Sequence, residues 1–207
     1  MVKVKICGHT RKSDIVSSAL AGADAVGVVH GFPDSPREVS SPMLDELFAA
    51  VPFMTQSVLV TNEDALARLE SPPTMNLQLH ARPERLVEIR DRYPRLKIMP
   101  VLRVGSSMPP EEVVRPYTLF DTVCLDTYAE GMHGGTGRIH DWRLSKAISK
   151  NFSCVVLSGG LNPTNVQEAI RMVEPYGVDV SSGVESSPGI KDAEKVRKFV
   201  QMVRQID

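Results

Sequence analysis

The chain has 207 residues, of which 42% are hydrophobic, and its 24 Lys and Arg nearly balance its 25 Asp and Glu. This length suits a single domain with a real core, and the balanced charge excludes a long-range field that attracts nucleic acid or anionic membranes. No apolar run approaches the roughly 20 residues that a bilayer requires. We therefore expect a cytoplasmic protein with no nucleic-acid partner and no membrane partner.

Cysteine usage points to a reducing compartment. The three cysteines, Cys7, Cys124 and Cys154, are widely spaced and form no CxxC pair. An odd number at this spacing argues against a disulfide framework and against a structural zinc site. The sequence predicts no metal site.

Short runs rich in β-branched residues alternate along the chain with stretches of helical periodicity. The candidate strands are 2–7, 25–29, 55–60, 75–80, 96–102, 121–126, 154–157 and 177–181. Between the last two of these, Asn162 is placed to cap a helix that begins at Pro163. The stretch 105–120 contains three prolines, so it predicts a short or irregular helix after the fifth strand.

Strands that alternate with helices in this way are typical of parallel βαβ units. A doubly wound open sheet usually needs fewer strands, and no GxGxxG motif follows the first strand. The pattern therefore predicts one (β/α)8 TIM barrel that spans residues 1–207.

In such a barrel the reactive groups lie at the carboxyl ends of the strands and in the loops that follow. Taken singly, each polar residue there has an ordinary explanation, such as a buried thiol, a solvated loop charge or a turn cap. Their convergence on one rim favours a common pocket. The candidates are Cys7, Arg37, His80, Asp126, Asp179, Ser181 and Ser182.

Two loops carry the pattern of a phosphate site. SGGLNPTN follows the seventh strand and SSGVESSPGIKD the eighth, so Gly159, Gly160, Ser182 and Gly183 are candidate phosphate-binding residues. Glycines allow backbone N–H groups to approach an anion, and barrels commonly bind phosphate with these two loops. Ordinary turns are the alternative for either loop taken alone.

Several motifs together resemble the phosphoribosylanthranilate isomerases of tryptophan biosynthesis, over nearly the whole chain and in order. They are VKICG, SPREVS, LQLH, LDT with GGTGRIHDW, LSGGLNPTNV and GVDVSSGVESSPGIKD. The resemblance implies a (β/α)8 barrel that carries out an Amadori rearrangement without any metal or organic cofactor. The substrate is N-(5-phosphoribosyl)anthranilate and the product 1-(2-carboxyphenylamino)-1-deoxyribulose 5-phosphate.

Matched residue by residue, the resemblance implies Cys7 as the general base and Asp126 as the general acid. It implies that Arg37 binds the anthranilate carboxylate, for which a planar guanidinium is suited. His80 and Asp179 match further substrate-binding residues. Gly159, Gly160, Ser182 and Gly183 match the phosphate cradle.

Some positions depart from the family pattern. His30 and Gly31 stand where an aromatic and a small residue are usual, and Glu38 stands where an aromatic commonly follows the arginine. The Gly-acidic pair often found after His80 is absent. These changes leave open how the anthranilate ring is bound, whereas the acid, the base and the phosphate loops are intact.

Strand alternation places Lys5 below Cys7 on the same inner face. We hypothesise that Lys5 is a buried cation that pairs with a carboxylate from another strand and favours the thiolate of Cys7. The alternative is that Lys5 extends to solvent.

Two other functions stay open on the sequence. Another phosphosugar-processing barrel enzyme would share the two loops, and so would a non-catalytic phosphate-ligand-binding barrel. The sequence also leaves open whether the chain is a monomer or a homodimer.

Overall fold

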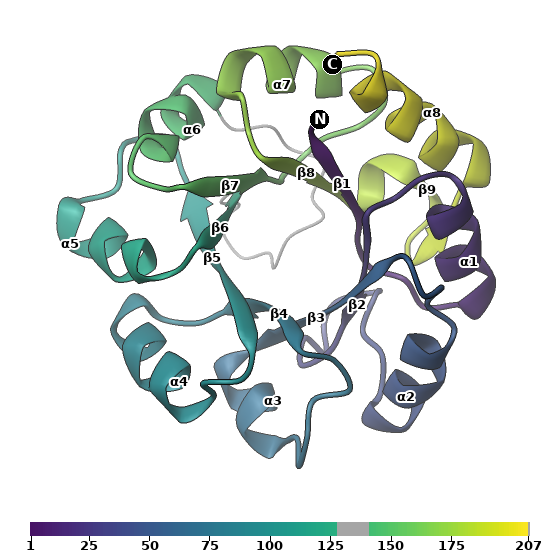
Figure 1. Cartoon of the computed structure of the whole chain (residues 1–207), viewed down its shortest axis with the longest axis horizontal. Coiled ribbons are helices and arrows are strands. Elements are labelled where there is room, and N and C mark those ends of the chain that lie inside the picture. The colour runs from purple at the N-terminus through teal and green to yellow at the C-terminus, as the bar shows by residue number, and fades with distance from the viewer. Residues whose placement is uncertain (128–140, 207) are drawn as a thin grey trace.

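The structure is a computed structural model that describes residues 1–127 and 141–206. Its strands form a closed parallel barrel in sequential order, with β8 hydrogen-bonded to β1, and helices surround the barrel on the outside (Figure 1). The barrel strands are β1 Lys3–Ile6, β2 Ala25–Val29, β3 Gln56–Asn62, β4 Asn76–His80, β5 Lys97–Val104, β6 Thr122–Thr127, β7 Cys154–Leu157 and β8 Gly177–Val180. The predicted (β/α)8 fold is confirmed.

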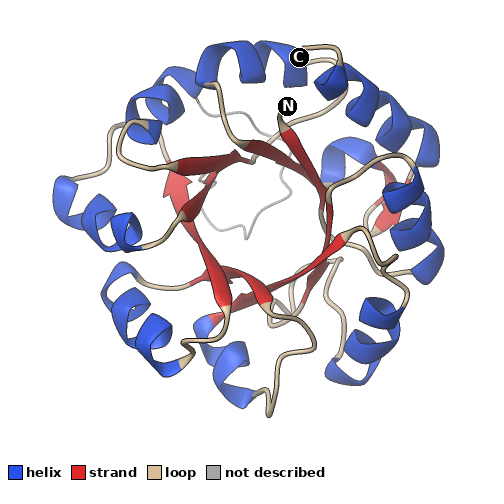
Figure 2. Ribbon diagram, viewed as in Figure 1, coloured by secondary structure: helices blue, strands red, loops and turns tan. Residues whose placement is uncertain are grey.

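The helices differ widely in length (Figure 2). The α-helices are α1 Lys12–Leu20, α2 Ser41–Ala49, α3 Glu63–Arg68, α4 Leu86–Arg92, α5 Glu111–Val114, α6 Trp142–Ser149, α7 Val166–Val173 and α8 Ala193–Arg204. Three 3₁₀ turns, η1 Pro83–Arg85, η2 Arg115–Leu119 and η3 Ser182–Val184, and a hairpin of β9 Glu185–Ser187 and β10 Ile190–Lys191 complete the described chain.

The helix after β5 has four residues and continues as the 3₁₀ turn η2, which confirms the prediction of a short or irregular helix there. The predicted start at Pro163 is wrong by three residues, because α7 begins at Val166. The side chain of Asn162 instead accepts hydrogen bonds within a turn, from the backbone N–H and the hydroxyl of Thr164.

The main core lies between the barrel and the helices. Val4 and Ile6 on β1 are fully buried, as are Phe199 and Val203 on α8. Burying side chains of this size stabilises a fold by about 1.5–3 kcal/mol each. Lys5 on β1 and Cys7 directly after it alternate with these residues and face the barrel interior, so one segment contributes to both core and site.

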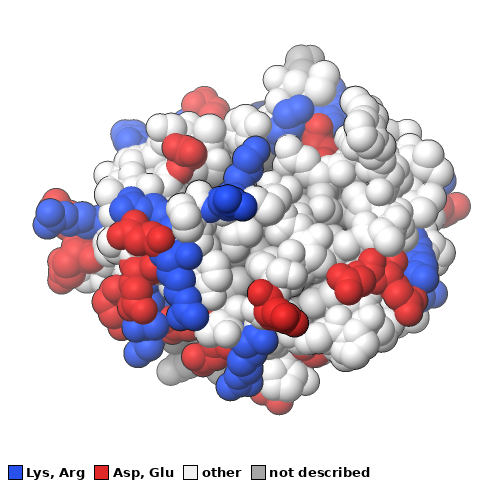
Figure 3. All heavy atoms as spheres, turned by 60° about the horizontal axis from the view of Figure 1, so that its bottom comes forward, with Lys and Arg blue, Asp and Glu red and all other residues white. Residues whose placement is uncertain are grey.

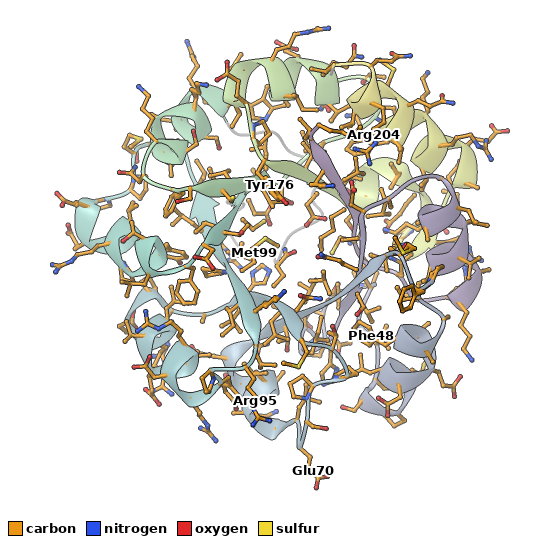
Figure 4. All side chains as sticks on the ribbon, viewed as in Figure 1. Phe48, Glu70, Arg95, Met99, Tyr176 and Arg204 are labelled. Carbon is orange, nitrogen blue, oxygen red and sulfur yellow. The ribbon has the colours of Figure 1, made fainter. Side chains whose placement is uncertain are left out.

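Arg204, in the last turn of α8, ties the end of the chain to its beginning (Figure 4). Its Nη1 donates to the carbonyl of Val2 at 2.7 Å, and its Nη2 donates to Gly22 at 3.1 Å and to Asp24 at 2.8 Å. These contacts hold the final helix against the strand that closes the barrel.

The two ends of the barrel interior differ. At the amino-terminal mouth, Met99 lies within the ring of strands and Tyr176 lies beside the start of β8 (Figure 4). The carboxyl ends of the strands form the opposite end. On the face shown in Figure 3, acidic and basic side chains lie next to one another, which fits the balanced composition. Within the described residues, the helices are too short or too polar to cross a membrane.

Candidate active site

A pocket opens at the carboxyl ends of the strands. Five of the residues predicted from the sequence line it, namely Cys7, Arg37, His80, Asp126 and Asp179. They come from the residue after β1, the loop after β2, and strands β4, β6 and β8, so residues distant in sequence share one rim. A closed parallel barrel produces this convergence, because every strand points its carboxyl end the same way.

Cys7 follows directly on β1 and is 7% exposed. Its backbone N–H donates to the carbonyl of Val180 at 2.8 Å, which holds the thiol at the barrel closure. Gly8 has a positive φ of 77°, and a Cβ there would lie 2.5 Å from Cδ of Arg37. Glycine is therefore required after the thiol, both for the turn and for the passage of the arginine.

Lys5 forms a buried ion pair with Asp179, which lies beside it on β8. Its Nζ donates to both carboxylate oxygens at 2.9 Å, and the lysine side chain is 7% exposed. Burial alone would lower the pKa of Lys5, but the negative charges of Asp179 and Cys7 and their hydrogen bonds together outweigh burial and raise that pKa. The structure confirms that Lys5 is buried and paired with a carboxylate from another strand.

The thiol of Cys7 experiences opposing influences. Burial raises its pKa, the Lys5 ammonium lowers it, and the negative charge of Asp179 raises it further. The net direction is upward. Lys5 thus favours the thiolate, as hypothesised, but does not outweigh desolvation in the free protein.

Asp126 lies near the end of β6 and is 8% exposed. Burial and the negative charge of Asp179 raise its pKa to about 6. Hydrogen bonds from the Thr127 N–H and the Ser158 hydroxyl lower the pKa but do not offset this rise. A carboxyl group with this pKa holds a proton near neutral pH far more often than an exposed one.

Arg37 is anchored by a residue that the sequence reasoning missed. Its Nε and Nη2 donate to the two carboxylate oxygens of Glu185, at 2.8 and 2.6 Å. Lys191 donates to the same carboxylate at 2.7 Å, and its side chain is fully buried. The motif GVESSPGIKD contains both residues, but its glycines and serines predict only a phosphate loop.

In the loop after β2, the three positions that depart from the family pattern, His30, Gly31 and Glu38, contact one another. The Glu38 carboxylate accepts from the backbone N–H groups of Gly31 and Phe32, at 3.0 and 2.8 Å, and lies 3.1 Å from Nδ1 of His30. The Phe32 ring meets His80 edge-on, with centroids 5.1 Å apart. Glu38 therefore holds the loop that presents an aromatic side chain to the pocket.

Three of the four predicted phosphate-binding residues, Gly159, Gly160 and Ser182, line the pocket. Gly183 is not among the lining residues. A Cβ on Gly183 would overlap the carbonyl oxygen of Leu161, so this glycine allows the loops after β7 and β8 to pack together.

The predicted Ser181 also lines the pocket, together with three polar residues that the sequence did not predict there, Ser35, Gln78 and Ser158. Gln78 is 4% exposed, and its Oε1 has no hydrogen-bond partner among the described residues. Its alternation with Leu77 and Leu79 was the available signal, since an amide between two outward-facing leucines faces the barrel interior.

The motif GGTGRIHDW lies largely outside the described residues, which resume at Asp141. Within the described chain, no cluster of three or more His, Cys, Asp or Glu side chains could hold a metal ion.

A (β/α)8 barrel with a buried acid, a thiol and a loop-borne arginine around one pocket is typical of an enzyme that moves protons on a small anionic substrate. The family model of N-(5'-phosphoribosyl)anthranilate isomerase matches residues 4–202. The N-(5'-phosphoribosyl)anthranilate isomerase of Methanopyrus kandleri is 40% identical, over 100% of both chains.

Solved structures agree. The structure of monomers of the dimeric phosphoribosylanthranilate isomerase of Thermotoga maritima has a TM-score of 0.79 and 32% identity, covering 99% of this chain and 100% of that one. A phosphoribosylanthranilate isomerase in complex with reduced 1-(o-carboxyphenylamino)-1-deoxyribulose 5-phosphate has a TM-score of 0.76 and 33% identity, with the same coverage. The chain belongs to the N-(5'-phosphoribosyl)anthranilate isomerase family.

Proposed function

We propose that the chain converts N-(5'-phosphoribosyl)anthranilate to 1-(2-carboxyphenylamino)-1-deoxyribulose 5-phosphate by an Amadori rearrangement in tryptophan biosynthesis, as one domain over residues 1–207. The observation that carries the mechanism is that a thiol, Cys7, and a carboxyl group of raised pKa, Asp126, line one pocket. Family membership and the product-like ligand of a relative support the substrate.

Asp126 acts first, as the general acid. It donates its proton to the furanose ring oxygen while the bond between C1' and that oxygen breaks. The lone pair of the anthranilate nitrogen forms the C1'=N bond of a protonated Schiff base. A pKa of about 6 suits this step, because such a carboxyl group gives up its proton readily near neutral pH.

Cys7 then acts as the general base. Its thiolate removes the proton from C2', and the electron pair of that C–H bond forms the C1'=C2' bond of an enolamine. The Schiff base nitrogen accepts the electrons of its own double bond and becomes neutral. Proton transfer from the C2' hydroxyl to C1' then gives the ketone, so the rearrangement balances without any redox partner.

The resting protonation states are the reverse of the productive ones. The pKa of Asp126 is about 6 and that of Cys7 is above its ordinary value. Near neutral pH the thiol is therefore protonated and the carboxyl group is ionised. Productive molecules carry the same number of protons, with the proton on Asp126. The fraction of productive molecules is therefore constant between the two pKa values, and it decreases below the lower pKa and above the upper one.

Substrate binding uses the rest of the rim. The guanidinium of Arg37 binds the anthranilate carboxylate, and His80 with Phe32 borders the ring. The backbone of Gly159, Gly160 and Ser182 binds the phosphate. Gly183 contributes by packing the two phosphate loops together.

Of the two assemblies left open by the sequence, we infer the homodimer. Phe53 and Met54 precede β3 at the amino-terminal mouth and are 99% and 89% exposed. A cavity of 710 Å³, lined in part by Met54 and Tyr176, opens beside them. A protruding apolar pair next to a hollow on the same face suits a two-fold contact, and one relative is dimeric. Sedimentation of Phe53→Ser against the unchanged chain tests this; equal masses would contradict it.

The decisive experiment follows the loss of fluorescence of freshly made phosphoribosylanthranilate. We expect turnover by the unchanged chain and a loss of about 10²–10⁴-fold in Cys7→Ser and in Asp126→Asn. Cys154→Ser and Asp121→Asn are the matched controls and should retain full activity. No turnover by the unchanged chain would refute the function, and full activity in both site variants would refute the mechanism.

A further inference from the structure

The hairpin of β9 and β10 carries two buried charges to the rim. Glu185 begins β9 and Lys191 ends β10, and their side chains are 4% and 0% exposed. The backbone N–H of Lys191 donates to Asp14 at 2.9 Å, and the Thr10 hydroxyl donates to the carbonyl of Gly189 at 2.7 Å. The hairpin is thus fastened to α1 and to the loop after β1, and its position is set by the barrel.

Glu185 occupies one edge of the guanidinium of Arg37. The pair is bidentate, with Nε and Nη2 both used, and such a fork fixes the plane of the guanidinium. The stem of Arg37 passes over Gly8, where Cδ lies 2.5 Å from the place a Cβ would take. Since Nε and Nη2 bond Glu185, Nη1 lies on the other edge of the guanidinium, and Arg37 lines the pocket.

The cluster of Arg37, Lys191 and Glu185 carries one more positive charge than negative charge. Two cations surround one carboxylate, and all three residues are at most 9% exposed. Buried charges are stable when they are paired. An incoming carboxylate on the remaining edge of Arg37 would complete the neutralisation.

We propose that Glu185, itself held by Lys191, is a positioning residue that fixes Arg37 so that its free edge receives the carboxylate of the substrate. This inference rests on the proposed function. Glu185 touches no reacting atom, so its contribution falls on ligand binding and leaves the proton-transfer steps alone. The opposite arrangement, in which Glu185 competes with the substrate for Arg37, predicts tighter binding once the carboxylate is removed.

Binding of two ligands distinguishes a Glu185 that positions Arg37 from a Glu185 that competes with the substrate for it. The first is the reduced product analogue, which carries the ring carboxylate, and the second is the same molecule with aniline in place of anthranilate. If Glu185 positions Arg37, Glu185→Gln should weaken binding of the first about tenfold or more, the effect of one charged hydrogen bond. Its affinity for the second should equal that of the unchanged chain.

Kinetics supply the second readout. We expect Glu185→Gln to raise KM for phosphoribosylanthranilate while kcat changes less than threefold or so, the pattern of lost uniform binding. Lys191→Gln should act in the same direction and more weakly, and the exposed Glu194→Gln is the matched control. If Glu185→Gln proves unfolded in a thermal melt, Glu185→Asp keeps the charge but shortens its reach, and the same selective loss is expected.

Equal weakening of both ligands, no weakening, or tighter binding of the carboxylate ligand would each overturn the proposal. Failure of the proposed function is a separate result, because the unchanged chain would then neither turn over phosphoribosylanthranilate nor bind the reduced analogue.

Discussion

Two buried clusters of ion-paired side chains lie at the site, and they differ in the kind of structural element to which their residues belong. Lys5 and Asp179 lie on adjacent strands of the barrel closure, whereas Arg37, Glu185 and Lys191 belong to the loop after β2 and to the extra hairpin. Both members of the first pair influence the pKa of Cys7, and Asp179 also raises the pKa of Asp126. In the second cluster Arg37 lines the pocket, and Glu185 and Lys191 lie behind it. We infer that strand-borne charge tunes the chemistry and loop-borne charge binds the ligand.

The difference follows from rigidity. The backbone of each strand in a closed barrel is hydrogen-bonded to a neighbouring strand on both sides, so a charged side chain on it keeps a fixed distance to Cys7 and Asp126. A loop can be replaced without disturbing the barrel, which is why substrate recognition varies on a common fold.

The largest expected effect comes from breaking the strand-borne pair. Asp179→Asn leaves the Lys5 ammonium buried without a counter-charge, and we expect a loss of about 3–5 kcal/mol of unfolding free energy. Denaturant titration measures it, and the double variant Lys5→Met with Asp179→Asn should recover most of the loss. A stability of Asp179→Asn equal to that of the unchanged chain would contradict the assignment.

Lys5→Met tests the tuning directly. Removal of the ammonium should raise the pKa of the Cys7 thiol further and lower kcat about tenfold for each unit of that shift. Thiol titration by ultraviolet absorbance measures the pKa, with Lys3→Met as the control on the same strand. A thiol pKa equal to that of the unchanged chain would remove Lys5 from the mechanism.

The pH profile tests whether the two groups act as a pair. Because the pKa of Asp126 is raised to about 6, kcat/KM should fall about tenfold per unit below that pH, where the thiol and the carboxyl group are both protonated. It should fall again above the raised pKa of Cys7. In Glu185→Gln both limbs should stay in place, which separates the two clusters.

The acid limb must be separated from unfolding. Burial lowers the pKa of His9 to about 3. Between about pH 6.5 and pH 3, the unfolded chain therefore binds a proton on this histidine that the folded chain does not bind. Stability is therefore complete above pH about 6.5 and decreases as the pH falls through that window. Thermal melts at each pH identify the range in which the profile reports on chemistry.

Glu38→Gln gives the smallest expected effect and concerns the loop alone. The neutral amide loses the charge-assisted bonds to Gly31 and Phe32, worth about 1–2 kcal/mol of local stability. We expect a rise in KM of a fewfold, with kcat and the pH limbs unchanged. A shifted acid limb would show that this loop also influences the chemistry.

Many of the residues that line the pocket could be predicted from the alternation of side chains along each strand and from the direction of the strands. Cys7, Asp126 and Asp179 end short β-branched runs, and Lys5 lies two residues before the thiol, so alternation and chain direction predict that they share one interior. The position of His80 followed in the same way, whereas Arg37 lies in the long loop after β2 and its role came from the family resemblance. The start of α7 was harder, because Asn162 and Pro163 suit a turn as well as a helix start.

The sequence by itself determined the barrel, the rim on which its polar residues converge and the family to which its motifs belong. These depend on periodicity and local order, which are properties of the chain alone. Only the tertiary structure decided that Glu185 holds Arg37 from 148 residues away and that Gly183 serves packing. Such contacts depend on where separate loops meet in space, and the local pattern of neither loop specifies its partner.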